Sequence, residues 1–256
     1  MKKNFNVEKE IDIITNGIKD FFTEELNIGS KAVIGISGGK DSTIAAALLV
    51  KALGADRVYG VLMPNGEQHD LITAMEVCTY LGIEYSVVNI KDICDQIYTT
   101  IPIVAENINV KINTPPRVRM TILYAYAAAL NGRVINTSNR SERYIGYFTK
   151  YGDGAGDFAI LKCYTATEVI AIGHALGIPD KYVDKTPEDG LSGKTDEEKL
   201  GFTYEELDNY ILDKEYYPNI STLEKIKHLS TISSHKRSLM RSVWNDKVCH
   251  LVKKYC

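Results

Sequence analysis

The sequence predicts an α/β protein in which a parallel twisted sheet carries helices on both faces. Short apolar segments typical of buried strands alternate with longer helical segments through the first half of the chain. A glycine-rich turn joins the first of these strands directly to a helix. Strand, helix and strand in succession require crossover connections, and such connections are typical of parallel sheets.

Each element is predicted from its own local pattern. Ile11, Ile14, Ile18 and Phe21 recur at helical spacing, which predicts a first helix that ends at about Leu26. The expected strands cover residues 31–36, 57–63, 84–90 and 133–137, and the further helices cover residues 43–53, 67–81, 117–130 and 165–177. The C-terminal third has a helical pattern, which predicts extra helices beyond the sheet.

Proline and glycine set the expected boundaries of two helices. A proline pair at residues 115–116 cannot sit inside a helix but can open one, so the helix should start at Arg117. Arg117 and Arg119 would then oppose the helix dipole, which favours a functional reason for them. Gly177, with Pro179 just beyond it, ends the last of these helices.

One domain spanning residues 1–256 is the simplest organisation. At roughly 150 residues per domain the length allows one large domain or two small ones, and no repeat or shift in composition marks a boundary. Residues 184–201 are polar and contain glycine, proline and charge. A loop of this length inside a domain is expected to be a lid or a disordered segment, and we expect it to be mobile without ligand.

Composition excludes several classes of protein. Hydrophobic residues make up 45% and charged residues 25%, as in ordinary globular proteins rather than disordered or fibrous ones. No apolar run reaches the roughly 18 residues of a membrane span, and the polar N-terminus does not resemble a secretory signal. A net charge of −3 gives no basic field for nucleic acid. The five cysteines form no CxxC pair and no zinc pattern, which favours a reducing cytoplasm.

The strongest chemical signal is the loop SGGKDS, residues 37–42, between the first strand and its helix. Its glycines let the backbone turn sharply, and a helix N-terminus offers free N–H groups and a positive dipole end to an anion. Lys40 adds a charge, and two serines add hydroxyl donors. The loop therefore predicts a phosphate cradle that is neither a Walker A nor a GxGxxG motif. The alternative is a glycine-rich turn with an N-cap serine.

Two carboxylates follow neighbouring strands. Asp41 follows the first strand, and Glu142 follows the strand at 133–137. Ligands of α/β sheets bind at the carboxyl ends of strands, where two carboxylates can share a Mg²⁺ that bridges phosphate oxygens. The glycine-rich run at residues 152–157 is either part of this site or a flexible turn.

These motifs together resemble one enzyme family. SGGKDS resembles the pyrophosphate-binding loop of the N-type ATP pyrophosphatases, which cleave ATP between its α and β phosphates. Residues 136–142 (NTSNRSE) and 146–157 (GYFTKYGDGAGD) closely resemble the signature of ammonia-dependent NAD synthetase. The segments 113–120, 184–201 and 234–237 match that family as well, so the resemblance runs from about Ile11 to Arg241.

The resemblance implies an adenine nucleotide alpha hydrolase-like fold and a homodimer, with the helix Arg117 to Leu130 as part of its interface. It implies that deamido-NAD, ATP and ammonia give NAD, AMP and pyrophosphate through an adenylated intermediate, with Mg²⁺ as the cofactor. The residues implied to bind ATP are Gly35, Ile36, Ser37, Gly38, Gly39, Lys40, Asp41, Ser42 and Thr137. Those implied for Mg²⁺ are Asp41 and Glu142, and those for deamido-NAD are Arg117, Lys150, Asp157, His235 and Lys236.

Two of these residues carry expected catalytic roles. Lys40 stabilises the charge that develops on pyrophosphate, and Asp157 accepts a proton from ammonium or positions it, as a hypothesis from its place in the motif. The tyrosines at 144, 147 and 151 offer a ring face for the pyridine or, more simply, pack in the core. Glutamine-using relatives carry an amidase domain, for which this chain is too short, so free ammonia or ammonia from a partner is the implied nitrogen source.

Two positions depart from the family pattern, and two other functions stay open. Ala166 stands where many members have a lysine placed to touch the ATP phosphates, and Glu188 stands where many have a threonine placed on ATP. Lys162 is a candidate substitute for the missing lysine. The alternatives are another adenylating enzyme, such as a tRNA-modifying relative, and a nucleotide-binding sensor without catalysis.

Overall fold

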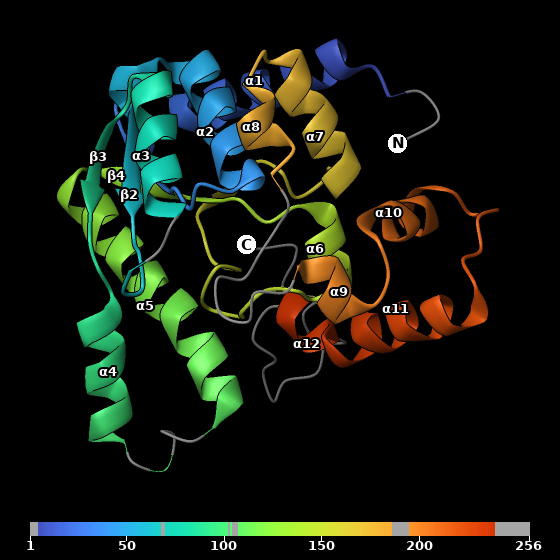
Figure 1. Cartoon of the computed structure of the whole chain (residues 1–256). Coiled ribbons are helices and arrows are strands. Elements are labelled where there is room, and N and C mark those ends of the chain that lie inside the picture. Colours follow the sequence, from blue (N-terminus) through green and yellow to red (C-terminus); the bar gives the residue numbers. More distant parts are fainter. Residues whose placement is uncertain (1–4, 68–69, 102, 104–106, 186–194, 239–256) are drawn as a thin grey trace, which may run out of the picture.

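The fold is a five-stranded parallel sheet with helices on both faces, as the sequence predicted (Figure 1). In this computed structural model the described residues are 5–67, 70–101, 103, 107–185 and 195–238. The strands are β1 (Lys31–Gly35), β2 (Val58–Leu62), β3 (Glu84–Val87), β4 (Gly132–Asn136) and β5 (Phe158–Ala159), in the spatial order β3-β2-β1-β4-β5. The register pairs Ala32 with Val58 on one side of β1 and with Arg133 on the other.

Helices surround this sheet and continue beyond it. They are α1 (Val7–Thr23), α2 (Lys40–Leu53), α3 (Asp70–Leu81), α4 (Lys91–Thr100), α5 (Ile108–Ala129), α6 (Arg140–Ile145), α7 (Ala166–Ala175), α8 (Asp180–Val183), α9 (Asp196–Leu200), α10 (Tyr204–Leu212), α11 (Ile220–Ile232) and α12 (Ser234–Arg237), with a 3₁₀ turn at Ala55–Arg57. The expected C-terminal helices are α9 to α12. No helix among the described residues is long and apolar enough to cross a membrane.

The alternation of side chains along the strands divides the core between the two faces. Ala32 and Ile34 of β1 pack into the cluster formed with α1, α2, α3 and α7. Val33, between them, packs into the cluster formed with α4 and α5. Successive side chains of a strand point to opposite faces, so a strand buried on both faces needs the near-continuous apolar run that β1 has.

The prediction that the proline pair opens a helix was wrong. The helix does not open at Arg117 but runs from Ile108 to Ala129 with Pro115 and Pro116 inside it. Pro115 is buried, and a Cβ on Gly152 would come within 2.9 Å of Pro116, so the pair packs against a distant loop. This packing is a tertiary contact that the local pattern does not contain. Arg117 therefore lies in the middle of the helix, and the argument from the helix dipole fails.

Several elements were missed or misjudged. Helices α4 and α6 and the two-residue strand β5 were not predicted, and α1 ends at Thr23 rather than at about Leu26. The expected loop at 184–201 lies partly outside the described residues, at 186–194, while its end forms helix α9. Leu200 of α9 is buried, which a free loop would not achieve.

Candidate active site

The glycine-rich loop connects the carboxyl end of β1 to the start of α2 and is braced by its own serines. The Ser42 hydroxyl oxygen accepts a hydrogen bond from the Ser37 backbone N–H at 3.3 Å and lies 3.1 Å from the Ser37 hydroxyl. The Ser37 hydroxyl in turn accepts from the Gly39 N–H at 3.2 Å. These bonds hold the loop in one shape before any ligand arrives.

Gly38 is required at its position for two reasons. Its φ is +80°, a left-handed conformation that favours glycine. A Cβ there would also lie 2.8 Å from the Asp70 carbonyl oxygen and 3.1 Å from the Ala74 backbone nitrogen. The loop therefore packs directly against the first turns of α3.

The structure brings the two predicted metal ligands together through a third residue. The Asp41 carboxylate accepts a hydrogen bond from the Lys40 ammonium at 3.0 Å and another from the Asn139 amide at 3.1 Å. Asn139 is fully buried and caps α6, where its backbone N–H donates to the Glu142 carboxylate at 3.0 Å. The end of β1 is thus joined to the end of β4, which is the point where the strand order reverses.

The charges of this cluster perturb one another. Burial and the neighbouring Asp41 raise the pKa of Glu142 well above its ordinary value, although Lys40 opposes the shift. Burial by itself would lower the pKa of Lys40, but Asp41, Glu142 and Asp196 outweigh it, and the pKa is raised. One ammonium among three acidic side chains leaves excess negative charge, and such a donor set fits a divalent cation.

Two residues of this cluster were missed by the sequence reasoning. Asp196 of α9 is only 8% exposed and accepts a hydrogen bond from the Tyr147 hydroxyl at 3.0 Å. The Tyr204 ring of α10 lies 5.7 Å from the Lys40 ammonium. No local signal marked either residue, because α9 and α10 meet the loop only through the fold. Asn139 lies inside the quoted motif, so its motif position was a signal that could have found it.

A cavity of about 360 Å³ opens at the carboxyl ends of β1, β2 and β4. Ser37 and Ser42 of the loop line one side of it, and Asn136 and Thr137 line another. The size is within the range of small-molecule sites. Predicted ATP residues from the loop and from the end of β4 therefore face one cavity.

Four of the five residues matched to deamido-NAD form a second group. The Arg117 guanidinium donates to the Lys150 carbonyl oxygen at 3.4 Å, and the Lys150 ammonium donates to the His235 carbonyl oxygen at 2.6 Å. Lys236 donates to the carbonyl oxygens of Gly146 and Phe148, each at 2.8 Å. Burial lowers the pKa of Lys236.

Asp157 has hydrogen-bond partners outside that group. Its carboxylate accepts hydrogen bonds from the Val134 backbone N–H at 2.7 Å and from the Tyr124 hydroxyl at 3.2 Å. The residue is exposed. It is therefore available to a ligand, but none of the described hydrogen bonds or ion pairs joins it to the loop or to Lys150.

The positions that differ from the family pattern, and the candidate substitute Lys162, lie in different surroundings. Ala166 is buried at the first turn of α7, in an apolar cluster with Ile145, Leu200 and Tyr204. Lys162 is exposed. Glu188 lies outside the described residues. At the position where the family pattern has a lysine, this chain therefore has a small apolar residue in a packed cluster.

Fold and site together define an α/β protein whose glycine-rich loop, at the end of the first strand, borders a cavity at the point where the strand order reverses. The family model for NAD synthase matches residues 10–240. The chain is 39% identical to the NH(3)-dependent NAD(+) synthetase of Pyrococcus furiosus over 93% of its length and 95% of that protein. It is 40% identical to the Thermococcus kodakarensis enzyme of the same name, over 87% of this chain and 93% of that one. This chain belongs to the NAD synthase family.

Solved structures agree with that membership. The NMN synthetase of Francisella tularensis superposes with a TM-score of 0.86 at 33% identity, covering 94% of this chain and all of that one. The NH3-dependent NAD synthetase of Campylobacter jejuni superposes with a TM-score of 0.78 at 27% identity, covering 93% of this chain and all of that one.

Proposed function

We propose that this chain is a ligase that amidates deamido-NAD with ammonia, using ATP and releasing NAD, AMP and pyrophosphate. The observation that carries the proposal is the link from Asp41 through Asn139 to Glu142 beside the phosphate loop and its cavity. A nucleotide-binding sensor needs the loop alone. The paired carboxylates supply what phosphoryl chemistry needs in addition.

The reaction begins with a carboxylate, which is a poor acyl donor. The pyridine carboxylate oxygen attacks the α-phosphorus of ATP, and the bond to the β-phosphate oxygen breaks to release pyrophosphate. We assign the loop N–H groups, the serine hydroxyls and Lys40 to stabilise the negative charge on that leaving group. Asp41 and Glu142 would hold Mg²⁺, which neutralises phosphate charge when it is bound.

Amide formation completes the reaction. Ammonia attacks the activated carbonyl carbon, and the bond to AMP breaks. Ammonium must first lose a proton, and we assign Asp157 as its acceptor or positioning group. Its exposed carboxylate supports this role, since it accepts two hydrogen bonds and keeps access to solvent.

We further propose that Arg117, Lys150, His235 and Lys236 bind deamido-NAD. Their contacts already bring α5, the loop after α6 and α12 together. The cationic side chains of this group suit a dinucleotide that carries a diphosphate. A cytoplasmic location stays a prediction from the sequence.

A homodimer is part of the proposal. Ile93 of α4 and Ile108 and Ile112 of α5 are exposed, with 64% of Ile108 accessible. These isoleucines lie on α4 and on the first turns of α5, outside the predicted interface segment Arg117 to Leu130, and they form apolar surface that a second copy would cover. Sedimentation of the purified chain measures this, and a monomer at all concentrations would contradict it.

The test of the activity mixes the protein with deamido-NAD, ATP, Mg²⁺ and ammonium and follows NAD, AMP and pyrophosphate together. Equal, ammonium-dependent formation of all three is expected. A parallel reaction replaces deamido-NAD with the pyridine mononucleotide that carries the same carboxylate, because one structural relative is an NMN synthetase. Faster formation of NMN than of NAD would change the substrate and keep the chemistry. ATP binding without cleavage would favour a sensor.

A further inference from the structure

A second lysine reaches the phosphate loop from outside the motif. Lys185 follows α8, and its ammonium lies 3.4 Å from the Gly38 carbonyl oxygen and 2.5 Å from the Asp70 carboxylate. Asp70 itself lines the cavity. Lys185 therefore joins the loop to the start of α3, beside a residue that lines the cavity.

The two lysines at the loop differ in what surrounds them. Lys40 is 6% exposed and shares its charge with Asp41, Glu142 and Asp196. Lys185 faces one carboxylate, and the side chains of this ion pair are 29% and 46% exposed. Partly exposed ion pairs of this kind are weak, so a phosphate group that carries more charge can displace Asp70.

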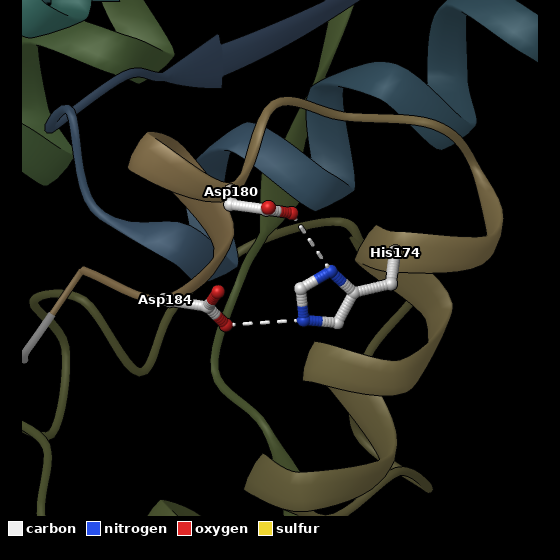
Figure 2. A group of neighbouring side chains, drawn as sticks. All are labelled: His174, Asp180 and Asp184. Carbon is white, nitrogen blue, oxygen red and sulfur yellow. Dashed lines mark hydrogen bonds and ion pairs between the residues drawn. The ribbon is translucent and has the colours of Figure 1, made fainter.

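Asp184, the residue before Lys185, is bonded to His174 and so anchors the chain next to Lys185. Figure 2 shows the imidazole of His174, in the last turn of α7, between two aspartates of the α8 region. Its Nδ1 lies 3.3 Å from the Asp180 carboxylate and its Nε2 lies 3.0 Å from the Asp184 carboxylate. Asp180 begins α8 and Asp184 directly follows it. Both ends of this short helix are thus held by one ring.

We propose that Lys185 binds the β and γ phosphates of ATP, leaving Asp70 to do so, and that His174 is the positioning residue for it. The inference deepens the proposed function, since it names a further binding residue of the same site. It gives the loop a second cation beside Lys40, and this cation has only one carboxylate partner to exchange for phosphate.

A purely structural ion pair is the competing explanation, and the chain contains a matched control. Lys181 lies in α8, just before Lys185, and pairs with Glu76 of α3 at 2.7 Å. That pair is also partly exposed, at 60% and 48%, and Glu76 is not among the residues that line the cavity. Lys181→Gln therefore measures what the loss of an α8–α3 ion pair costs by itself.

The experiment measures affinity for MgATP, Mg-pyrophosphate and AMP by calorimetry. Lys185→Gln should weaken MgATP and pyrophosphate binding by about tenfold or more and leave AMP unchanged, because AMP lacks the β and γ phosphates. Lys181→Gln should match the wild type. Asp70→Asn should bind MgATP at least as tightly as the wild type, because the competing carboxylate is gone.

Three results would overturn the proposal. Wild-type MgATP affinity in Lys185→Gln is the first. An equal loss for AMP is the second, because the lysine would then support the cavity rather than the phosphates. A loss in Asp70→Asn as large as that in Lys185→Gln is the third, because both would then act through the ion pair.

The role of His174 is tested in a double-mutant cycle. His174→Gln should weaken MgATP binding in the wild-type background and have no further effect in Lys185→Gln. Equal losses in the two backgrounds would contradict positioning. None of these binding measurements needs turnover, so their outcome is independent of the NAD assay. If no NAD forms but Lys185→Gln loses MgATP affinity, the proposed reaction fails and the phosphate contact remains.

Discussion

The residues matched to ATP and those matched to deamido-NAD are held in different ways. On the ATP side, the charged Asp41 carboxylate is bonded to the side chains of Lys40 and Asn139, and the loop serines bond to one another and to loop backbone groups. On the deamido-NAD side, Lys150 and Lys236 are bonded to backbone carbonyl oxygens.

This contrast fits the chemistry that we propose for each side. The ATP side concentrates charge, and charge is costly to bury unless each group has a partner beforehand. The deamido-NAD side contains exposed groups such as Arg117, His235 and Asp157, which water solvates until a ligand binds. We therefore expect substitutions on the ATP side to act on catalysis and stability together, and those on the other side to act on one substrate or one step.

The largest effect is expected from Glu142→Gln. Glutamine keeps the capping box of α6 but removes a charge that would hold Mg²⁺, so kcat/KM for NAD formation should fall by about 100- to 1000-fold. Steady-state kinetics across a range of Mg²⁺ concentrations measure this. Glu206→Gln is the control, because Glu206 has the same capping role in α10 and is not part of the cluster. Equal loss in both variants would assign the effect to capping.

Asp157→Asn separates the two chemical steps. If Asp157 accepts the proton from ammonium, amide formation should slow by about 100-fold, while pyrophosphate release changes little. Single-turnover experiments that follow pyrophosphate and NAD resolve the two. The companion variant Tyr124→Phe removes a donor to the carboxylate and keeps the charge, so it should be milder. Equal slowing of both steps would contradict the assignment of Asp157 as the proton acceptor.

Gly38→Ala tests how rigid the loop is. Any residue with a Cβ costs about 1–2 kcal/mol in the left-handed conformation, and here the Cβ would also meet the Asp70 carbonyl oxygen at 2.8 Å. Gly177→Ala supplies the comparison, since Gly177 has a φ of +71° and nothing within 4 Å of the added atom. The free energy of unfolding in urea should fall further for Gly38→Ala. Equal losses would show that the loop adapts.

The smallest effect is a pH dependence of stability. The pKa of Glu142 is raised in the folded protein by burial and by Asp41, so the folded state binds more protons than the unfolded state above pH 4.5. The contribution of Glu142 to stability without divalent cations is therefore fullest below that pH and declines as the pH rises toward the folded pKa. The melting temperature should fall by a few degrees from pH 5 to pH 8.

Glu142→Gln should flatten this slope. It will not remove the slope entirely, because burial raises the pKa of Asp208 as well. Added Mg²⁺ should raise the melting temperature more at pH 8 than at pH 5. The same slope in the variant as in the wild type would place the effect on other carboxyl groups.

Much of the ATP side was predictable from the sequence because its signals are local. The loop between β1 and α2 is a contiguous run, and parallel strands place their carboxyl ends at one edge, so Asp41 and Glu142 were expected to meet. The deamido-NAD residues were assigned by resemblance, and the contacts through the Lys150 and His235 carbonyl oxygens had no sequence signal. Asp196, Tyr204 and Lys185 reach the loop from segments more than 140 residues away in the chain.

By itself, the sequence determined the parallel α/β class, the phosphate loop and the family, because periodicity, glycine placement and contiguous motifs are properties of neighbouring residues. The tertiary structure alone decided that α5 runs through Pro115 and Pro116 and that Tyr204 faces Lys40. It also decided that His174 holds α8 beside the loop. Each of these depends on the balance between a local cost and contacts with residues far along the chain, and such contacts exist only once the chain has folded.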